Sequence, residues 1–192
     1  MKKIISGLKI ISVLVLALVL FSCNPVERAT NSGSFLIIES IIGKDTQGND
    51  STVVFSDIIT NGMVYSDFVN LTVRAATLDP NPIMGVSQYS DVMITNYIVT
   101  YIRSDGATGE GTDVPYHIEG TMSTLVPVGS SVSIPLLIVR DVAKTQPPLS
   151  TLGTGVLECT ARIELIGHDL RNRQVKQTGQ ITVRFADYVD QQ

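Results

Sequence analysis

Apolar and polar residues alternate along most of this chain, in short runs separated by clusters of turn-forming residues. From Leu157 to Leu165 and from Gly179 to Tyr188, every second residue faces one side, as in strands with one buried face. Further strands are expected at 35–42, 52–59, 68–78, 92–103, 116–122 and 131–139. The pattern predicts an all-β fold, an antiparallel β-sandwich of about eight strands, with a closed barrel as the alternative.

The last two runs predict a hairpin closed by a polar loop from His168 to Thr178. Their alternation fixes the register, because a slip of one residue would turn the apolar side chains toward water. The residues expected in the core are Cys159, Ile163, Ile181, Val183 and Phe185. Pro115 and Pro135 indicate edge strands or bulges, and 140–152 has room for one helical turn before Pro147.

The first 22 residues have the pattern of a signal sequence and not of a folded element. Three lysines (Lys2, Lys3 and Lys9) precede the apolar run Ile10–Phe21, which is shorter than the roughly 20 residues of a membrane-spanning helix. The run closes with Leu20-Phe21-Ser22-Cys23, which resembles the lipobox of bacterial lipoproteins.

This resemblance implies cleavage between Ser22 and Cys23, a diacylglyceryl group on the cysteine sulfur and acylation of the new amino group. Asn24 stands where an Asp would imply retention at the inner membrane, so the outer membrane is expected. The polar stretch 24–34 predicts a flexible tether. The expected organisation is therefore a signal peptide at 1–22, a lipidated cysteine and tether at 23–34, and a β-sandwich domain at 35–192.

Composition narrows the class of protein. The leader holds three lysines and no acids, so its removal changes the formal net charge from −4 to −7, which disfavours nucleic acid as a partner. Once Cys23 carries lipid, Cys159 has no partner for a disulfide and is expected to be an inert core residue. The expected sandwich is similar to immunoglobulin-like domains of exported bacterial proteins. The Trp and cysteine pair that mark a true antibody-type domain are absent from the sequence.

Two loops contain oxygen-bearing side chains that could bind calcium. The first holds Asp45, Asn49 and Asp50 around Gly48, and the second holds Asp105, Glu110 and Asp113. Neither matches the D-x-[DN]-x-[DN]-G pattern of a calcium loop, and the same residue types are ordinary in turns. The sequence therefore favours plain turns, with no metal and no cofactor.

The sequence contains no residue pattern that strongly indicates catalysis. His117 is expected on a strand surface and His168 in a loop, and two histidines with one core cysteine do not make a zinc site. The charged residues on the outer face of the final hairpin are expected to form ion pairs across its strands. They are Glu158, Arg162, Glu164 and Arg184.

These observations predict a lipid-anchored protein of the cell envelope that acts, without catalysis, as an interaction or assembly module with a protein partner. The alternative is an envelope ligand-binding lipoprotein or hydrolase that uses the loops 79–90, 105–113 and 144–152. A pocket joining those three loops would favour the alternative. An open sheet edge would favour the interaction module.

Overall fold

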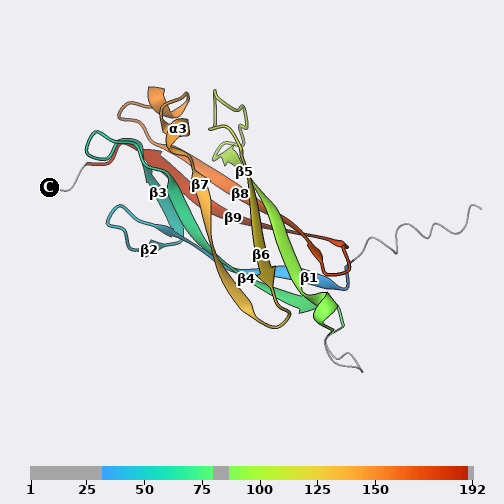
Figure 1. Cartoon of the computed structure of the whole chain (residues 1–192). Helices are drawn as coiled ribbons and strands as arrows, with labels where there is room; N and C mark the ends of the chain where they lie inside the picture. The colour runs from blue at the N-terminus through green and yellow to red at the C-terminus, as the bar shows by residue number, and fades with distance from the viewer. Residues whose placement is uncertain (1–31, 80–86, 190–192) are drawn as a thin grey trace, which may run out of the picture. The chain divides into compact units, whose positions relative to one another are not determined.

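The computed structural model describes residues 32–79 and 87–189. Within them, nine strands form two packed sheets, so the sandwich is confirmed and the closed barrel is wrong (Figure 1). The strands are β1 (Ser34–Lys44), β2 (Asp50–Ser51), β3 (Val53–Asp57), β4 (Asp67–Thr77), β5 (Val92–Arg103), β6 (Ile118–Val126), β7 (Ser131–Val139), β8 (Leu157–Asp169) and β9 (Gln174–Ala186). The short helical turns are η1 (Gln88–Ser90), α3 (Asp141–Lys144) and η2 (Leu149–Thr151).

One sheet has the order β2-β1-β4-β7 and the other β3-β9-β8-β5-β6. Strands β1, β4 and β7 are successive neighbours in the first sheet, and β9, β8, β5 and β6 are successive neighbours in the second. Both β6 and β7 end a sheet, as the prolines near them predict.

The sheets are not wholly antiparallel, which corrects the sequence expectation. Strand β3 runs parallel to β9, with Val54 opposite Val183 and Ser56 opposite Phe185. Alternation along a strand shows which face is buried, but it carries no information about the direction of the neighbouring strand.

The core lies between the two sheets and is built from the inward-facing residues of each strand. The five residues expected there, Cys159, Ile163, Ile181, Val183 and Phe185, are all buried. Phe185 packs edge-to-face against Tyr101 of β5, whose hydroxyl donates a hydrogen bond to the Ile138 carbonyl in β7. This hydrogen bond joins an inner strand of one sheet to an edge strand of the other.

The final hairpin has the expected register and a shorter loop than expected. Cys159 lies opposite Val183, and Ala161 opposite Ile181. The strands continue through His168 and Gln174, so the expected loop from His168 to Thr178 is wrong. Residues 174–179 are mostly polar, and only Val175 among them is buried. A strand with one solvated face can therefore have the composition of a loop.

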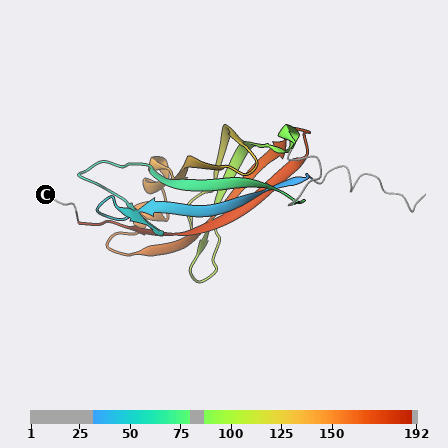
Figure 2. The ribbon, with the colours of Figure 1, turned by 90° about the horizontal axis from the view of Figure 1, so that it is seen from below.

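The two ends of the sandwich differ in what they carry. At the proximal end, defined here as the end where β1 begins, lie η1, the β8–β9 turn and the end of β4 (Figures 1 and 2). At the distal end lie the loop after β1, the β3–β4 connection and α3. The folded domain includes Ser32 and Ser34, both buried, so the structured part begins before the expected tether has ended. The signal peptide, the lipobox and residues 24–31 lie outside the described residues.

Candidate functional site

A half-open pocket of about 480 Å³ lies at the distal end of the sandwich. Its wall comes from the loop after β1, from β3 and the β3–β4 connection, and from the segment after β9. The lining includes three carboxylates, three aromatic rings and one ammonium group: Asp45, Asp57, Asp67, Phe55, Tyr65, Tyr188 and Lys144. The volume is within the range of about 300–1,000 Å³ typical of small-molecule pockets.

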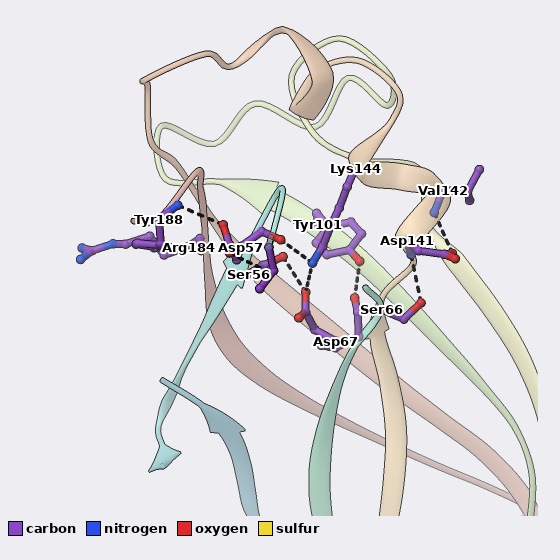
Figure 3. A network of polar contacts seen from close by, with 12 residues as sticks. Ser56, Asp57, Ser66, Asp67, Tyr101, Asp141, Val142, Lys144, Arg184 and Tyr188 are labelled. Carbon is purple, nitrogen blue, oxygen red and sulfur yellow. Dashed lines mark hydrogen bonds and ion pairs between the residues drawn. The ribbon is translucent and has the colours of Figure 1, made fainter. Parts of the chain in front are cut away.

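A buried ion pair forms part of the pocket wall. The Lys144 ammonium lies 2.9 Å from Asp67 Oδ2 and donates a 2.7 Å hydrogen bond to the Asp57 carbonyl (Figure 3). Only 1% of the Lys144 side chain is exposed, against 22% of the Asp67 side chain. The Ser56 hydroxyl donates a 2.6 Å hydrogen bond to the same Asp67 oxygen. This cluster joins α3 to β3 and β4, and therefore connects the two sheets at the distal end.

The local sequence explains how Lys144 reaches this position. Pro147 follows shortly after α3, so the helix has a single turn, as expected from the sequence. The Ser66 hydroxyl accepts a 3.0 Å hydrogen bond from the Asp141 backbone N–H and holds the start of the turn beside β4. Burial raises the pKa of Asp67, while the neighbouring Lys144 ammonium and the Ser56 hydroxyl act in the opposite direction.

The other two carboxylates are held by local hydrogen bonds. Asp57 accepts hydrogen bonds from the Thr60 hydroxyl at 2.7 Å and from the Tyr188 backbone N–H at 3.0 Å. Asp45 accepts the backbone N–H groups of Gln47 and Asn49, each at 2.8 Å, and so closes its own turn. Both carboxylates therefore stabilise the loops that form the rim.

The side chains around the ion pair differ in their exposure to solvent. The Ser56 hydroxyl, which contacts Asp67, is fully buried. The rim offers Tyr65, which is 54% exposed, and the rings of Phe55 and Tyr188, which pack edge to face at 6.0 Å. Aromatic rings of this kind supply contact area at a low cost in conformational entropy.

The calcium candidates are occupied by protein cations and backbone donors. Arg103 bridges Asp105 at 2.6 Å and Asp113 at 2.9 Å, while Glu110 lies 2.9 Å from His117 Nδ1. The Arg103 guanidinium lowers the pKa of Asp105 to about 2. In the first loop, Asp50 pairs with Lys44 at 2.7 Å and Asp45 closes its turn as described above. Among the residues that the structure describes, no group of three or more Cys, His, Asp or Glu side chains is arranged to hold a metal ion.

The expected positions of the two histidines are reversed. His117 precedes β6 and its Nδ1 lies 2.9 Å from Glu110 Oε1, whereas His168 lies in β8 opposite Met93. Cross-strand pairing is present on the outer face of the hairpin, because Arg184 lies 2.7 Å from Glu158. Glu164 pairs with Lys176 at 3.1 Å. Lys176 falls within the loop that the sequence predicts from His168 to Thr178.

The three loops named for the ligand-binding or hydrolase alternative lie at different ends. Strand β5 begins at the proximal end with Val92 opposite Asp169 and finishes at the distal end with Arg103 opposite Cys159. The described parts of loop 79–90 are therefore proximal, whereas loops 105–113 and 144–152 are distal. Of the described residues in these loops, Lys144 alone also lines the pocket.

Sequence analysis singled out Asp45 of this pocket as a calcium candidate, but neither Asp57 nor Asp67. Asp57 and Asp67 end and begin strands, positions at which acidic residues are ordinary in turns. The one-turn helix at Lys144 was expected, but a lone lysine in such a turn indicates solvent exposure, not burial.

No helix in the described part of the chain is long and apolar enough to cross a membrane. No protein-family model, curated protein sequence or solved structure matches the chain. The function therefore has to be argued from the geometry and the sequence of this chain.

Proposed function

We propose that the chain is a lipoprotein of the bacterial cell envelope, anchored through Cys23 and located at the outer membrane, whose sandwich acts as a non-catalytic interaction module. The lipobox Leu20–Cys23 supports the anchor, and Asn24 supports the outer membrane. The folded domain starts at Ser32, which leaves only residues 24–31 between the lipidated cysteine and the sandwich.

The observation that carries the interaction role is the position of the pocket at the end of the sandwich opposite the start of β1. A partner that approaches from outside the membrane would meet this end first. Its rim combines exposed Tyr65 with carboxylates that are already fixed in the loops. A rigid acidic and aromatic rim favours a protein partner with basic side chains, through ion pairing and cation–π contacts.

A photo-crosslinking experiment in cells tests this role. A photoreactive phenylalanine analogue placed at Tyr65 should yield one discrete cross-linked species. The same analogue at Arg162, an exposed residue on the outer face of β8, is the control and should yield none. Cross-linking of equal pattern and strength at both positions, or at neither, would contradict a specific partner at the distal end.

The pocket volume also favours a second candidate, a ligand-binding lipoprotein that holds a small molecule in the same pocket. Native mass spectrometry of the protein purified from its own cells distinguishes the two. A bound small molecule that is lost in the Tyr65→Asp variant and retained in Arg162→Ala would favour this candidate. A mass that corresponds to the lipidated chain with no bound small molecule would favour the protein partner.

A further inference from the structure

The proximal end of the sandwich carries exposed apolar side chains. Leu78 is 65% exposed, Tyr89 is 61% exposed and Leu170 is 43% exposed. The Arg171 guanidinium lies over the Tyr89 ring, 6.0 Å from its centroid. These four residues are named here the proximal surface.

Contacts between their loops bring the four residues to one end. The Leu170 N–H donates to the Asp91 carbonyl at 3.2 Å, which places the β8–β9 turn beside η1. The Leu78 N–H donates to the Gly33 carbonyl at 2.9 Å, and the neighbouring Ser32 hydroxyl donates to Asp169 at 2.8 Å. Figures 1 and 2 show the start of β1, the β8–β9 turn and η1 at the same end from two directions.

The length of the tether determines which end lies near the lipid. Nine peptide units join Cys23 to Ser32, so the link spans at most about 30 Å when fully extended. The distal end lies farther away by the length of β1, whose 11 residues span about 35 Å. A lipid on Cys23 therefore keeps the proximal end close to the bilayer.

We propose that the proximal surface docks onto the bilayer that holds the acyl chains of Cys23. This inference rests on the proposed lipidation. Leucine side chains bury apolar area among acyl chains, and tyrosine favours the interface between headgroups and hydrocarbon. Arg171 places a guanidinium where lipid phosphates lie.

Apolar contact is the larger part of this docking. One exposed acidic residue, Asp79, lies next to Leu78 and offsets part of the attraction of Arg171 for anionic lipid. Two other acids at this end face inward: Asp169 is buried, and Asp91 accepts the Val128 N–H at 2.9 Å. Docking in this orientation holds the sandwich upright and turns the pocket toward the side away from the membrane.

The absence of tryptophan from the sequence allows a direct test. Leu170→Trp places a single fluorophore on the proximal surface, and Val142→Trp places one on the exposed face of α3 at the distal end. The full lipidated chain is reconstituted in vesicles of phosphatidylethanolamine and phosphatidylglycerol with brominated acyl chains. We expect Leu170→Trp to emit at shorter wavelength and to lose most of its fluorescence to bromine quenching, whereas Val142→Trp should be unquenched.

A second variant separates docking from simple proximity on a tether. Tyr89→Asp combined with Arg171→Glu in the Leu170→Trp background should restore the fluorescence while the protein still floats with the vesicles. Floating protein in which Leu170→Trp is as unquenched as Val142→Trp would overturn docking and leave lipidation standing. Quenching that persists in the triple variant would likewise overturn docking through this surface. Protein that does not float at all would overturn the lipid anchor, and the docking with it.

Discussion

The hydroxyl of Ser32 donates a 2.8 Å hydrogen bond to the carboxylate of Asp169, although the two residues are 137 positions apart. The same carboxylate accepts the backbone N–H groups of Arg171 at 2.9 Å and Arg173 at 2.8 Å. One buried side chain therefore closes the β8–β9 turn and fixes the point at which the folded domain begins.

The first prediction concerns this carboxylate and pH. Burial acts to raise the pKa of Asp169, but hydrogen bonds from Arg173, Ser32 and Arg171 outweigh it and the pKa is lowered. A lowered pKa in the folded state stabilises the fold above the ordinary value near 4, and this contribution is lost as the pH falls through the folded-state pKa. Asp169→Asn should therefore cost about 2 kcal/mol at pH 7 and progressively less below pH ~4. Urea unfolding of the natural chain and of Asp169→Asn at pH 7 and below pH ~4 measures this loss. A loss in the free energy of unfolding that is the same at both pH values would contradict the prediction.

The second prediction concerns the ion pair of Lys144 and Asp67. Removal of one partner from a buried pair costs about 3–5 kcal/mol, because the other charge stays buried. Asp67→Ala should be the more damaging change, since the Lys144 side chain is almost wholly buried. Lys144→Met should cost less, because Asp67 is partly exposed and can take up a proton.

The double variant Lys144→Met with Asp67→Ala provides the control for this pair. Its free energy of unfolding, measured by urea titration, should lie above that of Asp67→Ala alone, because no unpaired charge remains. Additive losses in the double variant would show that the two charges do not interact.

The ion pair at the distal site could not be predicted from the sequence. A lysine buried against an aspartate 77 positions earlier is a property of how α3 folds back onto β4, and alternation along a strand does not reveal it. The calcium hypothesis likewise depended on which side chains the fold brings together. Asp105 and Asp113 have the residue types of a calcium site, and their actual cation is Arg103, which lies in the preceding strand.

The third prediction concerns Cys159. The thiol is buried, and burial raises its pKa to about 11, so very little reactive thiolate is present at neutral pH. A thiol reagent should modify Cys159 slowly in the native protein and rapidly in urea. Cys159→Ser should destabilise the fold by about 1–3 kcal/mol, because the new hydroxyl needs a partner in the core. Rapid modification of the native protein would contradict burial.

The fourth prediction compares two neighbours in β9. Phe185 is fully buried against Tyr101, so Phe185→Ala should cost about 3–5 kcal/mol. Arg184 faces solvent, where it pairs with Glu158 and lies over the Phe55 ring. An exposed pair contributes about 0–1 kcal/mol, so Arg184→Ala should cost no more than that. Equal losses, measured by thermal or urea unfolding, would show that the outer face is covered by another layer.

Much of the fold could be predicted because each strand has one buried face. The boundaries of β5 and β7 match the apolar runs 92–103 and 131–139 residue for residue. The errors have a common physical origin, which is that side-chain polarity reports exposure and not backbone pairing. Residues 174–178 were therefore assigned to a loop, and the parallel pairing of β3 with β9 was missed.

Both the proposed function and the docking of the proximal surface depend on lipid attachment at Cys23. The most direct test is metabolic labelling with a radioactive fatty acid, comparing the natural chain, Cys23→Ala and Cys159→Ala. Label should appear in the natural chain and in Cys159→Ala, each as the cleaved form. Cys23→Ala should be unlabelled and should keep residues 1–22, because the sulfur is the acceptor of the lipid. A labelled, cleaved Cys23→Ala protein, or a natural chain without label, would contradict lipid attachment at Cys23.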